Sequence, residues 1–100
     1  MPYSEQLADR IRSQFGDVEF DEARIMDGLG FFVDDRMDVG VLDDRLCLQM
    51  DESAVVGYLG EHGVDRYEFA GRPVPGWLAI TEAVLDDEGL AAWVTLGLEG

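Results

Sequence analysis

Residues 28 to 50 constrain the fold more than any other stretch of the chain. In 37–41 and 46–50 the apolar side chains recur at every second position, as they do on a strand with one packed face. Asp-Asp doublets at 34–35 and 43–44 interrupt these runs, and aspartate tolerates the strained backbone of tight hairpin turns. The stretch therefore predicts three antiparallel strands joined by two short turns.

Further elements flank this meander on both sides. Apolar residues four positions apart predict an amphipathic helix over 3–15, and Gly16 can end it. A connector follows, with a short strand near 23–27. After the meander we expect, in chain order, a short helix capped by Asp51, two strands, a helical turn and a final helix capped by Asp86, at 51–60, 65–70, 77–80, 82–85 and 87–97.

These elements predict an α+β fold in a single domain, residues 1–100. The expected order is α-βββ-α-ββ-α, a two-layer arrangement in which the helices cover one face of a mainly antiparallel sheet of five strands. With 100 residues, of which 47% are hydrophobic, the chain can bury its own core. We expect eight apolar side chains to lie in that core: Leu7, Ile11, Val39, Val41, Leu46, Leu48, Phe69 and Trp93.

The net charge of −15 sets the chain apart from an average domain. It contains 22 acidic and 7 basic side chains, and every basic residue is an arginine. So many carboxylates repel one another at ordinary ionic strength, whereas molar salt screens them beyond roughly 3 Å. A GC-rich genome also encodes arginine and aspartate readily, so two explanations are open. We favour adaptation to the salt-rich cytosol of a halophile.

Residues that could carry out chemistry are sparse. His62, the single histidine, lies in a loop pattern, and Cys47, the single cysteine, alternates with leucines as a packed thiol would. The sequence has no metal-ligand spacing and no nucleophile elbow, and the glycines at 28 and 30 lead into a strand rather than into a phosphate-binding helix. We expect no enzyme activity, no metal and no cofactor. A small-molecule-binding domain or an enzyme of unknown reaction is the alternative.

The sequence also bears on localisation and on nucleic-acid binding. It has neither a secretory signal nor an apolar run approaching the roughly 20 residues of a membrane span, so we expect a cytoplasmic protein that does not bind membranes. Phosphate contacts need clustered cations, which disfavours direct binding of nucleic acid. That alternative would require dispersed arginines to converge on one face, namely Arg24, Arg36, Arg45, Arg66 and Arg72.

A spaced pattern of glycines, aromatics and small residues runs along nearly the whole chain, at 24–33, 36–41, 71–77 and 90–93. This pattern resembles the N-terminal domain of the TfoX/Sxy family. The resemblance implies an α+β domain with an antiparallel sheet. It also implies a non-enzymatic regulatory role, because the founding bacterial members regulate natural competence with this domain ahead of a helical C-terminal one. We expect the chain to consist of the first domain alone, and single-domain members are largely of unknown function.

We therefore expect a regulatory or adaptor module that acts through protein–protein contacts with a protein partner of unknown identity. A homodimer is compatible with this expectation. The contact surface is predicted at the 71–77 loop and the neighbouring turn at Gly28, because both are glycine-rich and lie close to an arginine. Arginine and tryptophan often anchor protein interfaces. Gly28, Arg72 and Trp77 are thus the predicted partner-binding residues.

Overall fold

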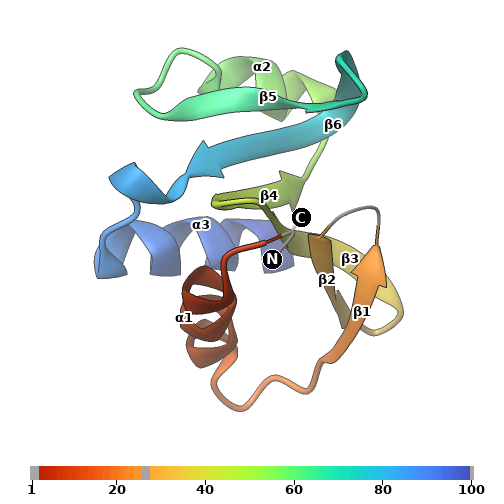
Figure 1. The fold of residues 1–100 in the computed structure, drawn as a ribbon, viewed down its shortest axis with the longest axis vertical. Coiled ribbons are helices and arrows are strands. Elements are labelled where there is room, and N and C mark those ends of the chain that lie inside the picture. Colours follow the sequence, from red (N-terminus) through yellow and green to blue (C-terminus); the bar gives the residue numbers. More distant parts are fainter. Residues whose placement is uncertain (1–2, 26–27, 100) are drawn as a thin grey trace.

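The computed structural model describes residues 3–25 and 28–99. Within them, six antiparallel strands form one sheet in the order β1-β2-β3-β4-β6-β5, accompanied by helices, which confirms the predicted α+β fold (Figure 1). In chain order the elements are α1 (Glu5–Phe15), β1 (Asp21–Ile25), β2 (Gly28–Val33), β3 (Arg36–Leu42), β4 (Arg45–Gln49), α2 (Glu52–Tyr58), β5 (Val64–Phe69), β6 (Arg72–Thr81), the 3-10 helix η1 (Glu82–Val84) and α3 (Asp87–Glu99).

Strand β1 makes the sheet one strand wider than the five that the sequence predicts. It pairs with β2 from Asp21 to Ile25, whereas the pattern suggests a short strand near 23–27 that is not among the five strands counted. Residues 26 and 27 of that range lie outside the described residues. Because β1 is exposed at the edge along most of its length, it lacks the alternation that marks a packed strand.

The Asp-Asp doublets form the predicted tight turns. Asp34 and Asp35, between β2 and β3, have φ angles of 52° and 65°, and Asp43, between β3 and β4, has a φ of 53°. Aspartate is one of the few residues with a Cβ that adopt this left-handed conformation at modest cost. The turns keep β2, β3 and β4 adjacent, as the predicted meander requires.

One face of the sheet packs against all three α-helices. Leu7 and Ile11 of α1, Val55 of α2, and Leu90 and Val94 of α3 belong to one core cluster with the inward-facing strand residues. Figure 1 shows α1 and α3 lying side by side on this face. Six of the eight predicted core residues are fully buried here: Leu7, Ile11, Val39, Val41, Leu46 and Leu48.

The predictions for Phe69 and Trp93 are wrong. Phe69 is 48% exposed, because it ends β5 opposite Arg72, where the β5–β6 hairpin extends past the last residue of β4. Trp93 is half-buried, because it lies at the rim between α2 and α3 and packs edge-on against Tyr58 with ring centres 5.2 Å apart. Alternation and helical spacing identify which side of a strand or helix is apolar. They do not show where the neighbouring elements end, and that decides whether a residue on the apolar side is buried.

Strand β6 lies between β4 and β5, and it begins at Arg72. Most of the predicted 71–77 loop is therefore strand, even though it contains Pro73 and Pro75. β4 pairs only with the later part of β6, from Trp77 to Thr81. The prolines thus occur where no β4 neighbour requires an N–H donor.

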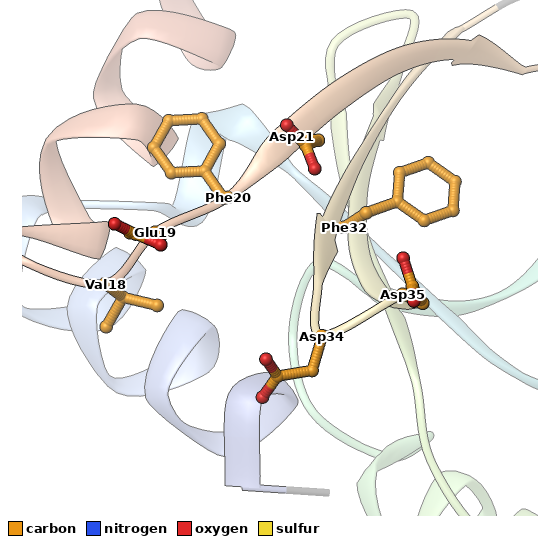
Figure 2. A pocket seen from close by; sticks show the side chains of 7 residues that line it. All are labelled: Val18, Glu19, Phe20, Asp21, Phe32, Asp34 and Asp35. Atoms are coloured by element: carbon orange, nitrogen blue, oxygen red, sulfur yellow. The ribbon is translucent and has the colours of Figure 1, made fainter.

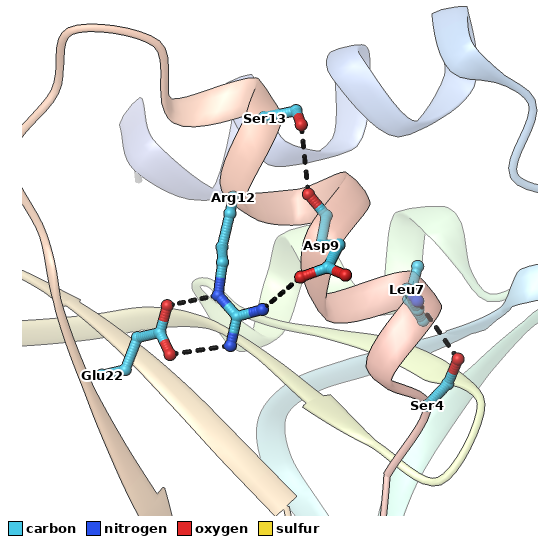
Figure 3. A network of polar contacts seen from close by, with 6 residues as sticks. All are labelled: Ser4, Leu7, Asp9, Arg12, Ser13 and Glu22. Carbon is cyan, nitrogen blue, oxygen red and sulfur yellow. Dashed lines mark hydrogen bonds and ion pairs between the residues drawn. The ribbon is translucent and has the colours of Figure 1, made fainter.

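Polar contacts fix the ends of the helices and attach α1 to the sheet. The hydroxyl of Ser4 accepts a hydrogen bond from the N–H of Leu7 at the start of α1, as an N-cap does. Arg12 donates to both carboxylate oxygens of Glu22 in β1 and also to Asp9 (Figure 3). These hydrogen bonds, above all those with Glu22, raise the pKa of Arg12.

The two predicted helix caps differ. Asp86 accepts a hydrogen bond from the N–H of Gly89 at 2.7 Å and caps α3 as expected. Asp51 precedes α2 but makes no side-chain cap bond. Its backbone carbonyl instead accepts the N–H groups of Ala54 and Val55.

Candidate functional site

The sheet face opposite the helices carries a second, smaller apolar cluster. Along β4, Leu46 and Leu48 pack against the helices, whereas Cys47 between them belongs to the other face. We call that other side of the sheet the open face. Its cluster consists of three buried residues surrounded by three half-buried ones: Cys47, Tyr67 and Ala79, with Leu42, Val74 and Trp77.

A row of short residues crosses the open face through all six strands. From one edge of the sheet to the other, the directly paired residues are Ala23, Gly30, Gly40, Cys47, Ala79 and Asp65. Gly30 has to stay small, because a Cβ there would lie 2.4 Å from Sδ of Met37 and 3.0 Å from Cδ1 of Ile25. Because the side chains in this row are short, longer side chains from the neighbouring rows can pack over it.

A groove runs along the open face towards the tip of the β5–β6 hairpin. It has two adjacent parts, of about 360 and 400 Å³, which share the lining residues Leu42, Asp43, Tyr67 and Glu68. We call it the open-face groove. The residues that line it are Leu42, Asp43, Arg45, Cys47, Asp65, Arg66, Tyr67, Glu68, Phe69 and Ala70.

Glu52, the first residue of α2, holds the strands around this groove in place. Its carboxylate accepts hydrogen bonds from Arg66 of β5 and from the backbone N–H of Gly76 in β6. The hydrogen bond from Arg66 is the main cause that lowers the pKa of Glu52, and the Gly76 N–H adds to it. The β5–β6 ladder shifts register here, so that 74–77 form a bulge. Glu52 thus fixes the bulge that presents Trp77.

The thiol of Cys47 is inert in this setting. The residue is fully buried, and this burial raises the pKa of the thiol to about 12, against an opposing influence from Arg45. Only a thiolate is a strong nucleophile, and very little thiolate exists at neutral pH with such a pKa. Cys47 is therefore the packed thiol that the sequence predicts.

Gly28 has a backbone role at the start of β2. It is buried and pairs with Ile25 on one side and Leu42 on the other. A Cβ at this position would lie 2.4 Å from the carbonyl oxygen of Val41 and 2.6 Å from Cγ of Leu42. Gly28 therefore supports the open face by leaving room for Leu42, and it offers no side chain to a partner.

Arg72 and Trp77 lie at two different places on β6. Arg72 is exposed at the hairpin tip opposite Phe69, and its side chain makes no hydrogen bond or ion pair with the part of the chain that the structure describes. Trp77 is half-buried and packs on the open-face cluster together with Leu42. The structure thus brings Gly28 and Trp77 to the same cluster through Leu42, and it places Arg72 at the end of the same hairpin.

Phe69, Tyr67 and Leu42 contribute to this surface without having been predicted as site residues. The aromatic pair at 67 and 69 reads in sequence as a packed strand, and only its position just before the turn at 70–71 distinguishes a hairpin tip from a strand interior. Leu42 gives no signal of its own, because its neighbours on the open face come from distant parts of the chain.

A separate acidic pocket of about 640 Å³ lies between the segment ahead of β1 and the β2–β3 turn (Figure 2). Its lining combines four carboxylates with three apolar side chains: Glu19, Asp21, Asp34 and Asp35, with Val18, Phe20 and Phe32. Across the described residues, no three His, Cys, Asp or Glu side chains are grouped so that they could hold a metal ion. Carboxylates exposed to solvent at a turn explain the acidic lining of this pocket.

None of the helices among residues 3–25 and 28–99 has the length and apolar character that a membrane crossing requires.

The family model of the TfoX N-terminal domain matches residues 10–100. No curated protein and no solved structure is significantly similar to the chain. The matched range contains all six strands, α2, α3 and every residue of the open-face groove. The chain therefore belongs to the TfoX N-terminal domain family, a family of non-catalytic regulatory domains.

Proposed function

We propose that this protein is a non-enzymatic regulatory module that binds another protein through the open-face groove and the tip of the β5–β6 hairpin. The observation that carries the proposal is Phe69, which is 48% exposed on a face that none of the described helices covers, at the end of a groove shared with Leu42 and Tyr67. A partly exposed aromatic ring beside an apolar groove is the kind of anchor that protein interfaces use.

The backbone around the groove is also held in a fixed position before a partner binds. Glu52 ties Arg66 and Gly76 to the start of α2, which fixes both the β5 wall and the bulge with Trp77. Little conformational freedom is then lost on association, and a smaller part of the interaction energy is spent on ordering the surface. Gly28 contributes indirectly, because it allows Leu42 to pack on this face.

Arg72 supplies a polar anchor next to these apolar ones. Its exposed guanidinium has no carboxylate partner within the described part of the chain. A guanidinium can form a bidentate pair with a carboxylate of a bound protein. Arg72 would thus fix the orientation of the partner, while Phe69 and Trp77 provide the buried area.

The pairing of the arginines favours a protein partner over nucleic acid. Nucleic acid requires cations that are free to neutralise phosphates. Much of the positive charge of this chain is already engaged by its own carboxylates, and Arg24 lies over the ring of Tyr3 with 5.7 Å to its centroid. The arginines in ion pairs are Arg10, Arg12, Arg36 and Arg66.

Affinity capture with the wild type and three variants as baits tests the proposal. The baits are the wild type, Arg72→Glu, Phe69→Ser and, as a matched control, Arg36→Glu, which makes the same charge change at another exposed arginine. We expect the wild type and Arg36→Glu to capture the same partner from a lysate of the source cells, and the other two to lose it. Melting curves establish that each bait is folded.

Two results would contradict the proposal. Identical partners on all four folded baits would remove Arg72 and Phe69 from the site. An empty capture by every bait, including the wild type, would count against a protein-binding role.

A further inference from the structure

The outer side of β1 offers an unpaired edge. β1 is the last strand of the sheet on its side, and within the described residues its outer backbone groups have no strand neighbour. Its pairing with β2 continues without irregularity from Asp21 to Ile25. The opposite edge strand, β5, carries a register shift between Arg66 and Glu68, and such irregularities hinder the addition of a further strand.

The charges of β1 are complementary to those of a second copy. If two copies of β1 pair antiparallel about Ala23, Glu22 of each copy stands directly opposite Arg24 of the other. Directly opposed side chains lie about 4.5–5.5 Å apart between Cβ atoms, and opposite charges at such positions stabilise the pair. The two-fold symmetry makes this ion pair form twice, once on each side of Ala23, as a two-fold interface requires.

The neighbouring registers are unfavourable. Glu22 and Arg24 lie opposite Phe31 and Leu29 of the core, so they belong to the helix-covered face, and Ala23 belongs to the open face. In the joined sheet the helices of both copies lie on the same side. The nearest alternative registers that keep this arrangement are centred on Glu22 or on Arg24 in place of Ala23. Those centres place Glu22 against Glu22 or Arg24 against Arg24, and like charges directly opposed are destabilising.

The side chains of β1 are free enough to make these contacts. Arg24 is exposed, and among the described residues its side chain contacts the ring of Tyr3 and forms no ion pair. Glu22 already binds Arg12, but its carboxylate has about four acceptor positions and Arg12 uses two. At the centre, Ala23 has a short side chain that lets the two backbones approach.

We infer that two copies of this chain associate through β1, pairing antiparallel about Ala23 with reciprocal Glu22–Arg24 ion pairs. The joined sheet would run through both copies, with the open-face groove of each left free. Because each copy carries a net charge of −15, the association should strengthen when salt screens that repulsion. The interface is independent of the proposed binding function.

Analytical ultracentrifugation in multimolar KCl tests this inference with Glu22→Arg and Arg24→Glu. Each variant alone replaces both reciprocal attractions by repulsions, and its dimerisation should be weaker than that of the wild type by about tenfold or more. An equimolar mixture of the two variants restores two opposite-charge pairs in every mixed dimer. We therefore expect the mixture to dimerise although neither variant does so alone.

The mixture separates this interface from loss of folding, because a misfolded variant would not be rescued by its counterpart. A wild type that stays monomeric in multimolar KCl would overturn the inference. So would a wild-type dimer that both single variants reproduce, or a mixture of folded variants that remains monomeric.

Discussion

Leu42 packs into the space that the missing side chain of Gly28 leaves open, with Cγ of Leu42 2.6 Å from where a Cβ of residue 28 would stand. The carbonyl oxygen of Val41 would lie 2.4 Å from the same Cβ, and a backbone atom cannot move aside as a side chain can. The identity of residue 28 therefore determines how Leu42 can pack against the open-face cluster.

We expect Gly28→Ala to lower the free energy of unfolding by roughly 1–3 kcal/mol through overpacking. Gly57 in α2 provides the matched control, since nothing lies within 4 Å of a Cβ placed there. Gly57→Ala should raise stability by about 0.5–1 kcal/mol, as alanine does in a helix interior. Urea denaturation measures both, and equal effects of the two substitutions would contradict the packing argument.

Removing the Glu52 carboxylate should change how stability depends on pH. The pKa of Glu52 is lowered in the folded protein, so its contribution is present above the unfolded pKa of about 4.3 and is lost as the pH falls through the folded value. The difference in melting temperature between the wild type and Glu52→Gln should therefore shrink in acid. Arg66→Gln, which removes the other partner, should behave alike; a difference that stays constant with pH would argue against this linkage.

The buried thiol should affect stability in alkali. Because the pKa of Cys47 is raised to about 12, its contribution is fully present below the unfolded pKa of about 8.5 and is lost as the pH rises towards 12. Cys47→Ala should lack this part of the pH dependence. Iodoacetamide should label the wild type at pH 8 only after denaturation, whereas rapid labelling of the folded protein would show that the thiol is accessible.

Salt should stabilise the protein over the molar range. The 22 acidic side chains repel one another in the folded state, and screening removes much of that cost. Thermal melts in low and multimolar KCl measure the effect, with an uncharged osmolyte as the comparison. A melting temperature that does not respond to KCl would favour genome composition as the origin of the acidity.

Two phenylalanines should differ sharply on truncation. Phe31 is 1% exposed and packs against both Phe15 and Phe20, whereas Phe69 is 48% exposed at the hairpin tip. We expect Phe31→Ala to cost about 3–5 kcal/mol and Phe69→Ala less than about 1 kcal/mol. Comparable losses in a denaturation experiment would mean that the hairpin tip packs more tightly than its exposure indicates.

The central part of the fold is predictable because its signals are local. The alternation in β3 and β4 and the Asp-Asp turns lie within a few residues of one another, and the structure places Asp34, Asp35 and Asp43 in the expected turn conformation. The pairing of β1 with the sheet could not be predicted from alternation, because its packing is one-sided and most of its residues are exposed. Burial at Phe69 depends on where β4 ends, which the sequence of β5 does not contain.

The open-face groove is less predictable still. Its lining comes from 42–47 and 65–70, and the two segments meet only because β6 places Ala79 between Cys47 and Asp65. Trp77 and Arg72 stay predicted contact residues, and the structure places them at two positions on β6. The sequence could not show that Gly28 acts through Leu42, since that contact depends on the register between β2 and β3.

The position of β6 between β4 and β5 also sets an order of events during synthesis. When the first four strands have left the ribosome, β4 is still an edge strand, and it carries Leu46, Cys47 and Leu48, which are all fully buried in the finished protein. That edge can be closed only by residues 77–81, which are made some thirty positions later. Non-local pairing of this kind slows folding and leaves an apolar strand open to other chains in the meantime. The nascent chain is therefore most vulnerable to aggregation between the emergence of β4 and the docking of β6.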